Sequence, residues 1–250
     1  MGWASFPRVP RTLVDWPAQL ELRRYGARAS DLDVDLDQPI RALACAEVVA
    51  ACASPALAAA QVAGVPVSVR VRAALRLAAL ETPDSEQVLR CHSCNDELAV
   101  SLPLATLASD DGEPVAAVEV DGVRVRVPTG ADQASWARRG GFSPALLGEL
   151  VESGEPPSQP AFLAAVESGL ADVDPLVEFA VRTACPACGA GVSAPVDLEA
   201  VALAPLRRVK RDLIADVHRL ASVYHWSEEA ILALPAHRRA AYLELVGGDA

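Results

Sequence analysis

The sequence predicts an α+β protein, in which a mostly helical body carries a small inserted antiparallel β-hairpin lobe. Two observations lead to this fold class. Residues 39–80 and 203–246 place apolar side chains at helical spacing, whereas residues 97–102 and 115–127 alternate apolar and polar side chains with the period of two typical of strands. A third observation, two cysteine pairs that flank the alternating region, indicates how the two parts are joined.

The cysteine pairs both have C-x-x-C spacing; they are Cys91 with Cys94 and Cys185 with Cys188. This spacing lets two thiolates bind one side of a tetrahedral zinc ion, so four thiolates would complete a closed structural site. Gly189 supports metal binding, because glycine permits the positive-φ turn that directs backbone amides at a sulfur. The sequence therefore predicts a Cys₄ zinc ribbon, split by the 90 residues between the pairs.

Other interpretations of the cysteines remain open. The separation exceeds the roughly 15–20 residues of the common zinc-ribbon pattern, so the pairs could be unrelated knuckles or bare thiols, and C-x-x-C also occurs in redox motifs. His92 lies inside the first pair, either as a replacement ligand or as an exposed bystander. Cys45 and Cys52 lie seven residues apart on an Ala-rich helical stretch, and we expect buried free thiols there.

We expect four regions along the chain. They are an irregular N-terminal arm (1–38), an N-terminal helical lobe (39–90), the split zinc ribbon (91–195) with its inserted hairpin and helical lobe (95–184), and a C-terminal helical region (196–250). Within the arm, four aspartates between positions 31 and 37 alternate with apolar residues. This pattern is typical of a short edge strand or a solvated linker.

The inserted lobe contains the clearest local signal. Asp121-Gly122 separates two alternating runs within residues 115–127, which predicts a hairpin with a type I′ turn. Ser143-Pro144 has the composition of an N-cap followed by a first-turn proline, and therefore predicts a helix that extends to about Val151. A further helix is predicted over Phe162–Ala171.

The C-terminal region is predicted to be entirely helical, over about Leu203–Tyr224, Glu228–Leu234 and Ala236–Val246. Four basic residues occur in the first half of the long helix: Arg207, Arg208, Lys210 and Arg211. They could form a phosphate-binding patch or a solvated face with salt bridges. The formal net charge of −11 favours the solvated face, because nucleic-acid binding needs a basic surface that replaces phosphate counterions.

We find no sequence signature of catalysis. The phosphate-binding, dinucleotide-binding, zinc-protease and nucleophile-elbow motifs are missing, and none of the four histidines has the spacing of a catalytic triad. The first residues lack the basic and apolar segments of a signal peptide, and the uncharged stretch 48–69 is Ala-rich rather than rich in large apolar residues. We therefore expect a non-enzymatic, cytoplasmic protein without a membrane partner.

The C-terminal sequence resembles the end of a known family. It reads His218-x-Leu220-Ala221-x-x-Tyr224-His225-Trp226-Ser227, then Ile231-Leu232-x-Leu234-Pro235-x-x-Arg238-Arg239-x-x-Tyr242-Leu243. This pattern is similar to that of the baseplate hub assembly proteins (hub assembly chaperones) of T-even-like contractile phages, whose relatives occur in gene clusters of contractile injection systems. The run Pro128-Thr129-Gly130-Ala131-Asp132-Gln133 and the two flanking C-x-x-C knuckles are also similar, so the resemblance covers roughly residues 90–245.

The resemblance implies a non-enzymatic assembly factor or minor component of a baseplate, with hub or spike proteins as partners. Its candidate partner-binding residues are Tyr224, Trp226, Arg238, Arg239 and Tyr242. The three aromatic residues among them would be either core anchors or interface hot spots. The alternative is a zinc-ribbon module that binds nucleic acid or a transcription partner through residues 207–211 and the hairpin arginines, Arg124 and Arg126.

Overall fold

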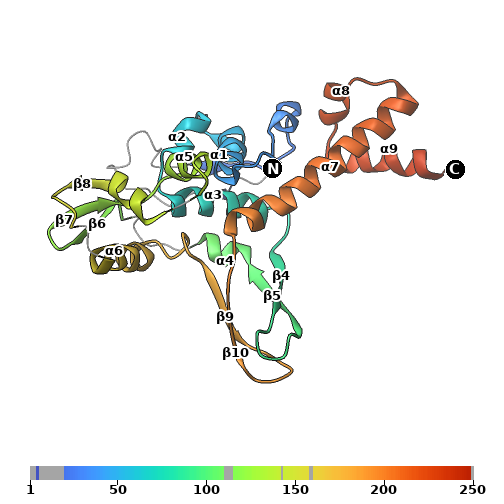
Figure 1. The fold of residues 1–250 in the computed structure, drawn as a ribbon. Helices are drawn as coiled ribbons and strands as arrows, with labels where there is room; N and C mark the ends of the chain where they lie inside the picture. Colours follow the sequence, from blue (N-terminus) through green and yellow to red (C-terminus); the bar gives the residue numbers. More distant parts are fainter. Residues whose placement is uncertain (1–3, 6–19, 110–114, 142, 158–159, 249–250) are drawn as a thin grey trace.

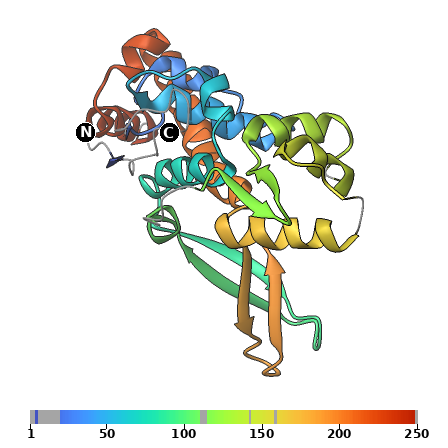
Figure 2. The ribbon, with the colours of Figure 1, turned by 90° about the vertical axis from the view of Figure 1, so that its left-hand side faces the viewer.

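The computed structural model describes residues 4–5, 20–109, 115–141, 143–157 and 160–248. Its strands form small antiparallel sheets beside a larger helical part, as the predicted α+β class requires (Figures 1 and 2). Most of the predicted N-terminal arm, residues 1–3 and 6–19, lies outside the described residues. None of the helices in the described part of the chain combines the length and the hydropathy needed to cross a bilayer.

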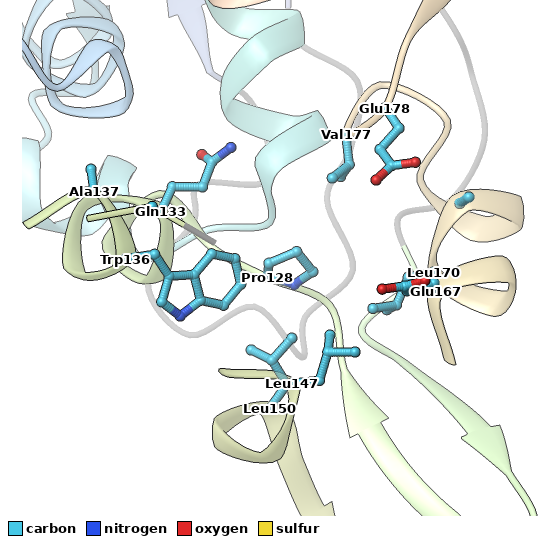
Figure 3. A pocket seen from close by; sticks show the side chains of 12 residues that line it. Pro128, Gln133, Trp136, Ala137, Leu147, Leu150, Glu167, Leu170, Val177 and Glu178 are labelled. Carbon is cyan, nitrogen blue, oxygen red and sulfur yellow. The ribbon is translucent and has the colours of Figure 1, made fainter. Parts of the chain in front are cut away.

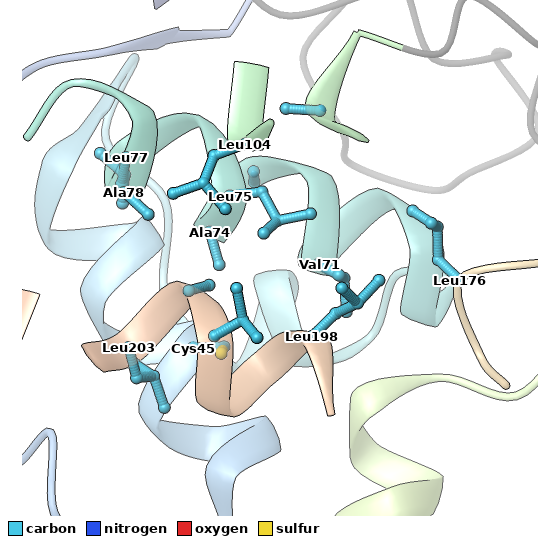
Figure 4. Close-up of a cluster of buried hydrophobic side chains, with 14 of the residues drawn as sticks. Cys45, Val71, Ala74, Leu75, Leu77, Ala78, Leu104, Leu176, Leu198 and Leu203 are labelled. Carbon is cyan, nitrogen blue, oxygen red and sulfur yellow. The ribbon is translucent and has the colours of Figure 1, made fainter. Parts of the chain in front are cut away.

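The body is built around one central helix, α3 (Val67–Ala79). The other helices of the body are α1 (Arg41–Cys52), α2 (Ala59–Ala63), α4 (Leu104–Ala108) and the first half of α7 (Leu198–Tyr224). Helix α3 is buried on nearly every side, with Val71, Leu75 and Leu77 in the core (Figure 4). Its alanines let α1 and α7 approach closely, which explains why an Ala-rich sequence with few aromatic residues still forms a core.

The segment before α1 differs from the prediction. A three-stranded sheet pairs β1 (Ala4–Ser5), β2 (Glu21–Leu22) and β3 (Ala53–Ser54). The first part of the aspartate-rich stretch belongs to a 3₁₀ helix (Ala29–Asp33), and no part of the stretch forms an edge strand. Asp31 is fully buried because both of its carboxylate oxygens accept hydrogen bonds of 2.5 Å from the guanidinium of Arg23. This buried ion pair decides the local structure.

Two hairpins project from the body on the same side (Figures 1 and 2). One consists of β4 (Asp84–Arg90) and β5 (Glu97–Pro103), and the other of β9 (Ala180–Ala184) and β10 (Gly191–Pro195). Strand β4 corrects the prediction, which assigned all of residues 39–90 to a helical lobe. The sequence of this strand has no continuous apolar face. In the structure Leu89 is its only buried residue, and Val88 is 67% exposed. Pairing with β5 therefore determines this strand.

The chain between the hairpins forms a lobe with its own core. Its elements are α5 (Gly130–Arg138), α6 (Pro160–Val173), a 3₁₀ helix (Pro144–Leu150) and a sheet of β6 (Ala117–Val120), β7 (Val123–Arg126) and β8 (Val151–Ser153). Asp121 and Gly122 both have positive φ, 50° and 75°, as a type I′ turn requires. The stretch after Ser143 is a 3₁₀ helix instead of the predicted α-helix. The lobe core includes Val125 and Phe162.

A buried arginine connects the lobe to the body. Arg70 of α3 has no exposed surface, and its Nη2 donates to Gln133 Oε1 of α5 at 2.6 Å and to Glu199 of α7. A Cβ on Gly130 would lie 1.8 Å from Arg70 Nη1, so a larger residue at the start of α5 would have to displace this buried guanidinium. The same guanidinium thus connects its own helix α3 to two others, and its burial is stabilised by the ion pair with Glu199.

The C-terminal helices form an arm that extends away from the body (Figure 1). The arm contains the second half of α7, together with α8 (Glu228–Leu232) and α9 (Ala236–Gly248). Helix α7 begins at Leu198, five residues before the predicted start, because the side chain of Asp197 accepts a hydrogen bond from Ala200 N and caps the helix. The helix ends at His225, which is in the left-handed conformation.

Candidate metal centre

The four cysteines of the predicted zinc site come together at the ends of the two hairpins. Cys91 and Cys94 lie in the turn between β4 and β5, and Cys185 and Cys188 lie in the turn between β9 and β10. The Sγ atoms of Cys91 and Cys188 are 3.7 Å apart, and those of Cys94 and Cys185 are 3.6 Å apart. All four sulfur atoms lie within 4.8 Å of one another.

The spacing of the sulfur atoms fits a metal ion better than disulfides. A disulfide requires a sulfur–sulfur distance of about 2.05 Å, and all four cysteines are free. A tetrahedral zinc ion with Zn–S bonds of about 2.3 Å would place its sulfur ligands about 3.8 Å apart. The observed distances of 3.6 and 3.7 Å agree with that arrangement. The cluster could therefore hold a metal ion with four thiolate ligands.

The two knuckles share one backbone geometry although their sequences differ. In the first, Asn95 N donates to Cys91 O and Cys91 N donates to Asp96 O, both at 2.9 Å. In the second, Gly189 N donates to Cys185 O at 2.9 Å, and the N–H of the same cysteine donates to the oxygen of Ala190 at 2.8 Å.

The residue after each second cysteine has positive φ, 62° at Asn95 and 73° at Gly189. Asparagine tolerates this region better than other non-glycine residues, so it can replace the glycine that the second knuckle uses. The sequence interpretation did not assign this role to Asn95. The signal was its position, which matches that of Gly189 four residues after the first cysteine of its pair.

Backbone amides make the sulfur cluster unequal before any metal is considered. The N–H groups of Cys94 and Ser93 lower the pKa of the Cys91 thiol to about 6. The N–H of Asp96 lowers the pKa of Cys94. The neighbouring sulfurs and burial together raise this pKa by more, so that it lies at about 12. One thiolate thus forms readily and then opposes ionisation of its neighbours. A bound cation would remove that repulsion, because it attracts every thiolate.

The remaining candidate ligands and thiols lie outside the cluster. His92 is exposed and is not part of the four-residue group, which favours the bystander interpretation. Cys45 and Cys52 are fully buried free thiols, which confirms the prediction. Burial raises the pKa of both thiols, that of Cys52 to about 12, so neither is a reactive thiolate at neutral pH.

The aromatic residues of the C-terminal pattern form a cluster on the arm. Tyr224 stacks on Trp226 with ring centroids 4.7 Å apart, and Tyr242 meets both rings edge-on at 5.6 and 5.0 Å. All three side chains are partly exposed, so the cluster is neither a fully buried core nor a set of isolated surface residues. Aromatic pairs in these geometries each stabilise by about 0.5–1.5 kcal/mol beyond their burial. The cluster therefore fixes how α9 packs on α7.

The two candidate arginines of α9 have different surroundings. Arg238 is exposed, whereas the guanidinium of Arg239 is mostly covered and lies 3.9 Å from Asp216 of α7. In the basic group of α7, Arg207 donates to Leu36 O at 2.6 and 2.9 Å, and Lys210 donates to Val34 O at 2.7 Å. These two cations hold the N-terminal segment against the long helix.

Comparisons of the chain with family models, with curated proteins and with solved structures gave no match.

Proposed function

We propose that this chain is a non-enzymatic structural or assembly protein of the baseplate of a phage-tail-like contractile injection system. In this proposal the C-terminal arm binds a hub or spike protein, and the cysteine cluster holds a structural zinc ion. The assembly role is supported by the arm itself, because the residues of the C-terminal sequence pattern lie together on its three packed helices. The proposal also places the protein in the cytoplasm, where thiols stay reduced.

The arm has the properties of a protein-binding surface. Tyrosine, tryptophan and arginine are the residues most enriched among binding hot spots, and Tyr224, Trp226 and Arg238 all retain accessible surface there. Large apolar side chains are exposed on the same helices: Ile214 (49%), Val223 (51%) and Leu245 (63%). A partner that covers these side chains would remove apolar area from water next to an aromatic cluster that is already rigid.

The zinc proposal rests on the chemistry of the donors. Four thiolates are a ligand set that zinc commonly takes in structural sites, with no position left open for water or substrate. The site joins two hairpins that otherwise bury little, with Leu89 and Leu98 in one hairpin and Val181 and Val192 in the other. Structural zinc contributes on the order of 10 kcal/mol to folding in small domains. We infer that the ion makes the two hairpins one zinc ribbon, which the lobe interrupts.

Nucleic-acid binding is the competing function, and the contacts of the basic residues argue against it. Arg207 and Lys210 are engaged by backbone oxygens of the N-terminal segment. In the β-lobe, Arg124 pairs with Glu152 at 2.9 Å and Arg126 pairs with Asp132 at 2.6 Å. Internal partners thus already use four of the six cations that would have to contact phosphates; the other two, Arg208 and Arg211, are exposed.

The partner proposal is tested by co-expression of the chain with hub and spike proteins from a contractile particle gene cluster, followed by co-purification. We expect a stable complex, and we expect Arg238→Glu to weaken it. Arg211→Glu is the matched control, because it makes the same change at an exposed arginine on the first half of α7, and it should leave the complex intact. Absence of any complex with the folded protein would contradict the proposal. Salt-sensitive binding to DNA would instead support the competing function.

The metal proposal is tested by the metal content of the purified protein, determined by mass spectrometry, together with a count of thiols that react under native conditions. We expect one zinc ion per chain and protection of the four clustered cysteines until a chelator is added. A different metal would refute the zinc assignment. A protein with no metal and four reactive thiols would refute the metal centre itself.

A further inference from the structure

A cavity of about 350 Å³ lies in the lobe, and none of the residues that line it belongs to the cysteine cluster or to the C-terminal arm. Its walls come from α5, the 3₁₀ helix Pro144–Leu150, α6 and the segment 177–178 that leads to β9 (Figure 3). Cavities of this size are within the range that binds small organic ligands or single side chains of a partner.

Most of the cavity wall is apolar and held in place by the lobe core. Trp136, Leu147, Leu150 and Leu170 line the cavity, and each is at least nine-tenths buried. These four residues come from three different helices, so their positions depend on the packing of the lobe rather than on one flexible loop. This wall is suited to an alkyl chain, and the indole ring also provides a π face that attracts cations.

Two carboxylates complete the cavity on its other side. Figure 3 shows the carboxyl groups of Glu167 and Glu178 across the cavity from the indole ring of Trp136. Neither carboxylate forms a hydrogen bond or an ion pair with the described residues, whereas Asp132 and Glu152 of the same lobe each pair with an arginine. Among the described residues that line the cavity, none is basic.

We propose that this cavity binds an organic cation: an ammonium or guanidinium group carried on a short alkyl stem. The stem packs against Trp136 and the leucines, and the charged end lies between Glu167 and Glu178. An anion would meet two negative groups. A neutral ligand would gain nothing from the two carboxylates, because both glutamates are exposed and stay hydrated beside it. The net charge of −11 also attracts cations to the protein surface.

The inference does not rest on the proposed baseplate function, because it involves neither the cysteines nor the arm. The test is a titration monitored by the indole N–H signal of Trp136 in a ¹H–¹⁵N spectrum, assigned with Trp136→Phe. Three probes share one alkyl chain: hexylammonium, hexanol and hexanoate. We expect a saturable shift of the indole signal with hexylammonium, weaker binding of hexanol and no binding of hexanoate.

The double variant Glu167→Gln, Glu178→Gln separates the charge from the shape of the cavity. Both glutamates are exposed, and two exposed ion pairs account for about a fivefold difference in affinity, so the variant should bind hexylammonium about fivefold more weakly and hexanol with unchanged affinity. Glu229→Gln on α8 is the matched control and should change neither affinity. Equal binding of hexanol and hexylammonium by the unmodified protein, or no saturable shift with any probe, overturns the proposal.

The same titration identifies the source of the cation. A tripeptide with a central arginine, acetylated and amidated at its ends, and free hexylammonium are compared. Tighter binding of the peptide indicates that a basic side chain of a partner polypeptide occupies the cavity. Tighter binding of hexylammonium indicates a free amine. Either result supports a cation site, since both ligands carry the same chemistry.

Discussion

The two cysteine hairpins have the same backbone at their tips and little sequence in common. Both bring two sulfurs to one point, both close the turn with the same pair of backbone hydrogen bonds, and both place one residue at positive φ. They reach this geometry with Asn95 in one case and Gly189 in the other, and with strands of seven and five residues. The comparison shows that a pair of backbone hydrogen bonds and a left-handed residue define the knuckle, rather than a fixed set of residues.

The first hairpin differs in how its strands are supported. Arg90, before the knuckle, and Glu97, after it, face each other across the hairpin and form an ion pair of 2.7 Å. The matching positions of the second hairpin are Ala184 and Gly191. The second hairpin has no such charge pair at this position. If a shared ion fixes both hairpins, the ion pair and the choice of left-handed residue should contribute little to the free energy of unfolding. The variants below test that conclusion.

The largest effect is expected from loss of a sulfur in either hairpin. Cys91→Ser and Cys185→Ser should both release the metal and lower the melting temperature by the same amount, because each removes one of four ligands from one ion. Metal content and thermal unfolding measure the two effects. The control is Ser93→Ala, an exposed residue of the first knuckle that supplies no thiol. If one cysteine variant kept its metal and its melting temperature, the two hairpins would not share a site.

Acidification should release the metal from both hairpins together, because protons compete with the ion for the thiolates. The amides of Cys94 and Ser93 lower the pKa of Cys91, so this sulfur stays ionised to lower pH than an ordinary thiol. Metal content as a function of pH, at fixed chelator concentration, measures the release. Release of metal in two separate steps as the pH falls, one for each hairpin, would argue against one shared ion.

A smaller effect is expected at the left-handed residue of the second hairpin. Gly189→Ala should lower the free energy of unfolding by about 1 kcal/mol, since a side chain is disfavoured at a φ of +73° while the space around a new Cβ is open. Denaturant unfolding of the metal-bound protein measures this change. Gly191→Ala is the matched control: its Cβ would also be unobstructed, but its φ lies outside the left-handed region, so we expect no loss.

At the equivalent position of the first hairpin the change should be smaller still. Asn95→Gly relieves the remaining strain of positive φ but gives the unfolded chain more freedom, so the two contributions oppose each other and the net change stays within about 0.5 kcal/mol. The same unfolding experiment applies. A loss as large as that of Gly189→Ala would mean that the Asn95 side chain itself stabilises the knuckle, for example through its 3.4 Å contact with Arg90.

The smallest effect is expected for the ion pair of the first hairpin. Arg90 and Glu97 are 60% and 62% exposed, and exposed pairs contribute about 0.2–1 kcal/mol. A double-mutant cycle of Arg90→Ala and Glu97→Ala should give a coupling near the lower end of that range and should decrease with added salt. A coupling above this range would show that the two hairpins are supported in different ways.

The sequence predicted the features that depend on local chemistry. The cysteine spacing predicted the cluster, periodicity located α1, α3, α6 and the C-terminal helices, and Asp121-Gly122 located the turn between β6 and β7. Strand β4 was missed because its own residues contain no apolar face. The long helix was placed five residues late, because the capping role of Asp197 depends on where the preceding strand ends.

The sequence by itself determined which residues can bind a metal, where most helices form and which residues make up the C-terminal pattern. Only the tertiary structure decided that Asp31 is buried against Arg23, that Arg70 connects the lobe to the body, and that Glu167 and Glu178 face a cavity without a partner. The physical reason is the range of the interactions. Helices, turns and knuckles follow from residues a few positions apart, whereas buried charges and cavities depend on segments that meet only when the chain folds.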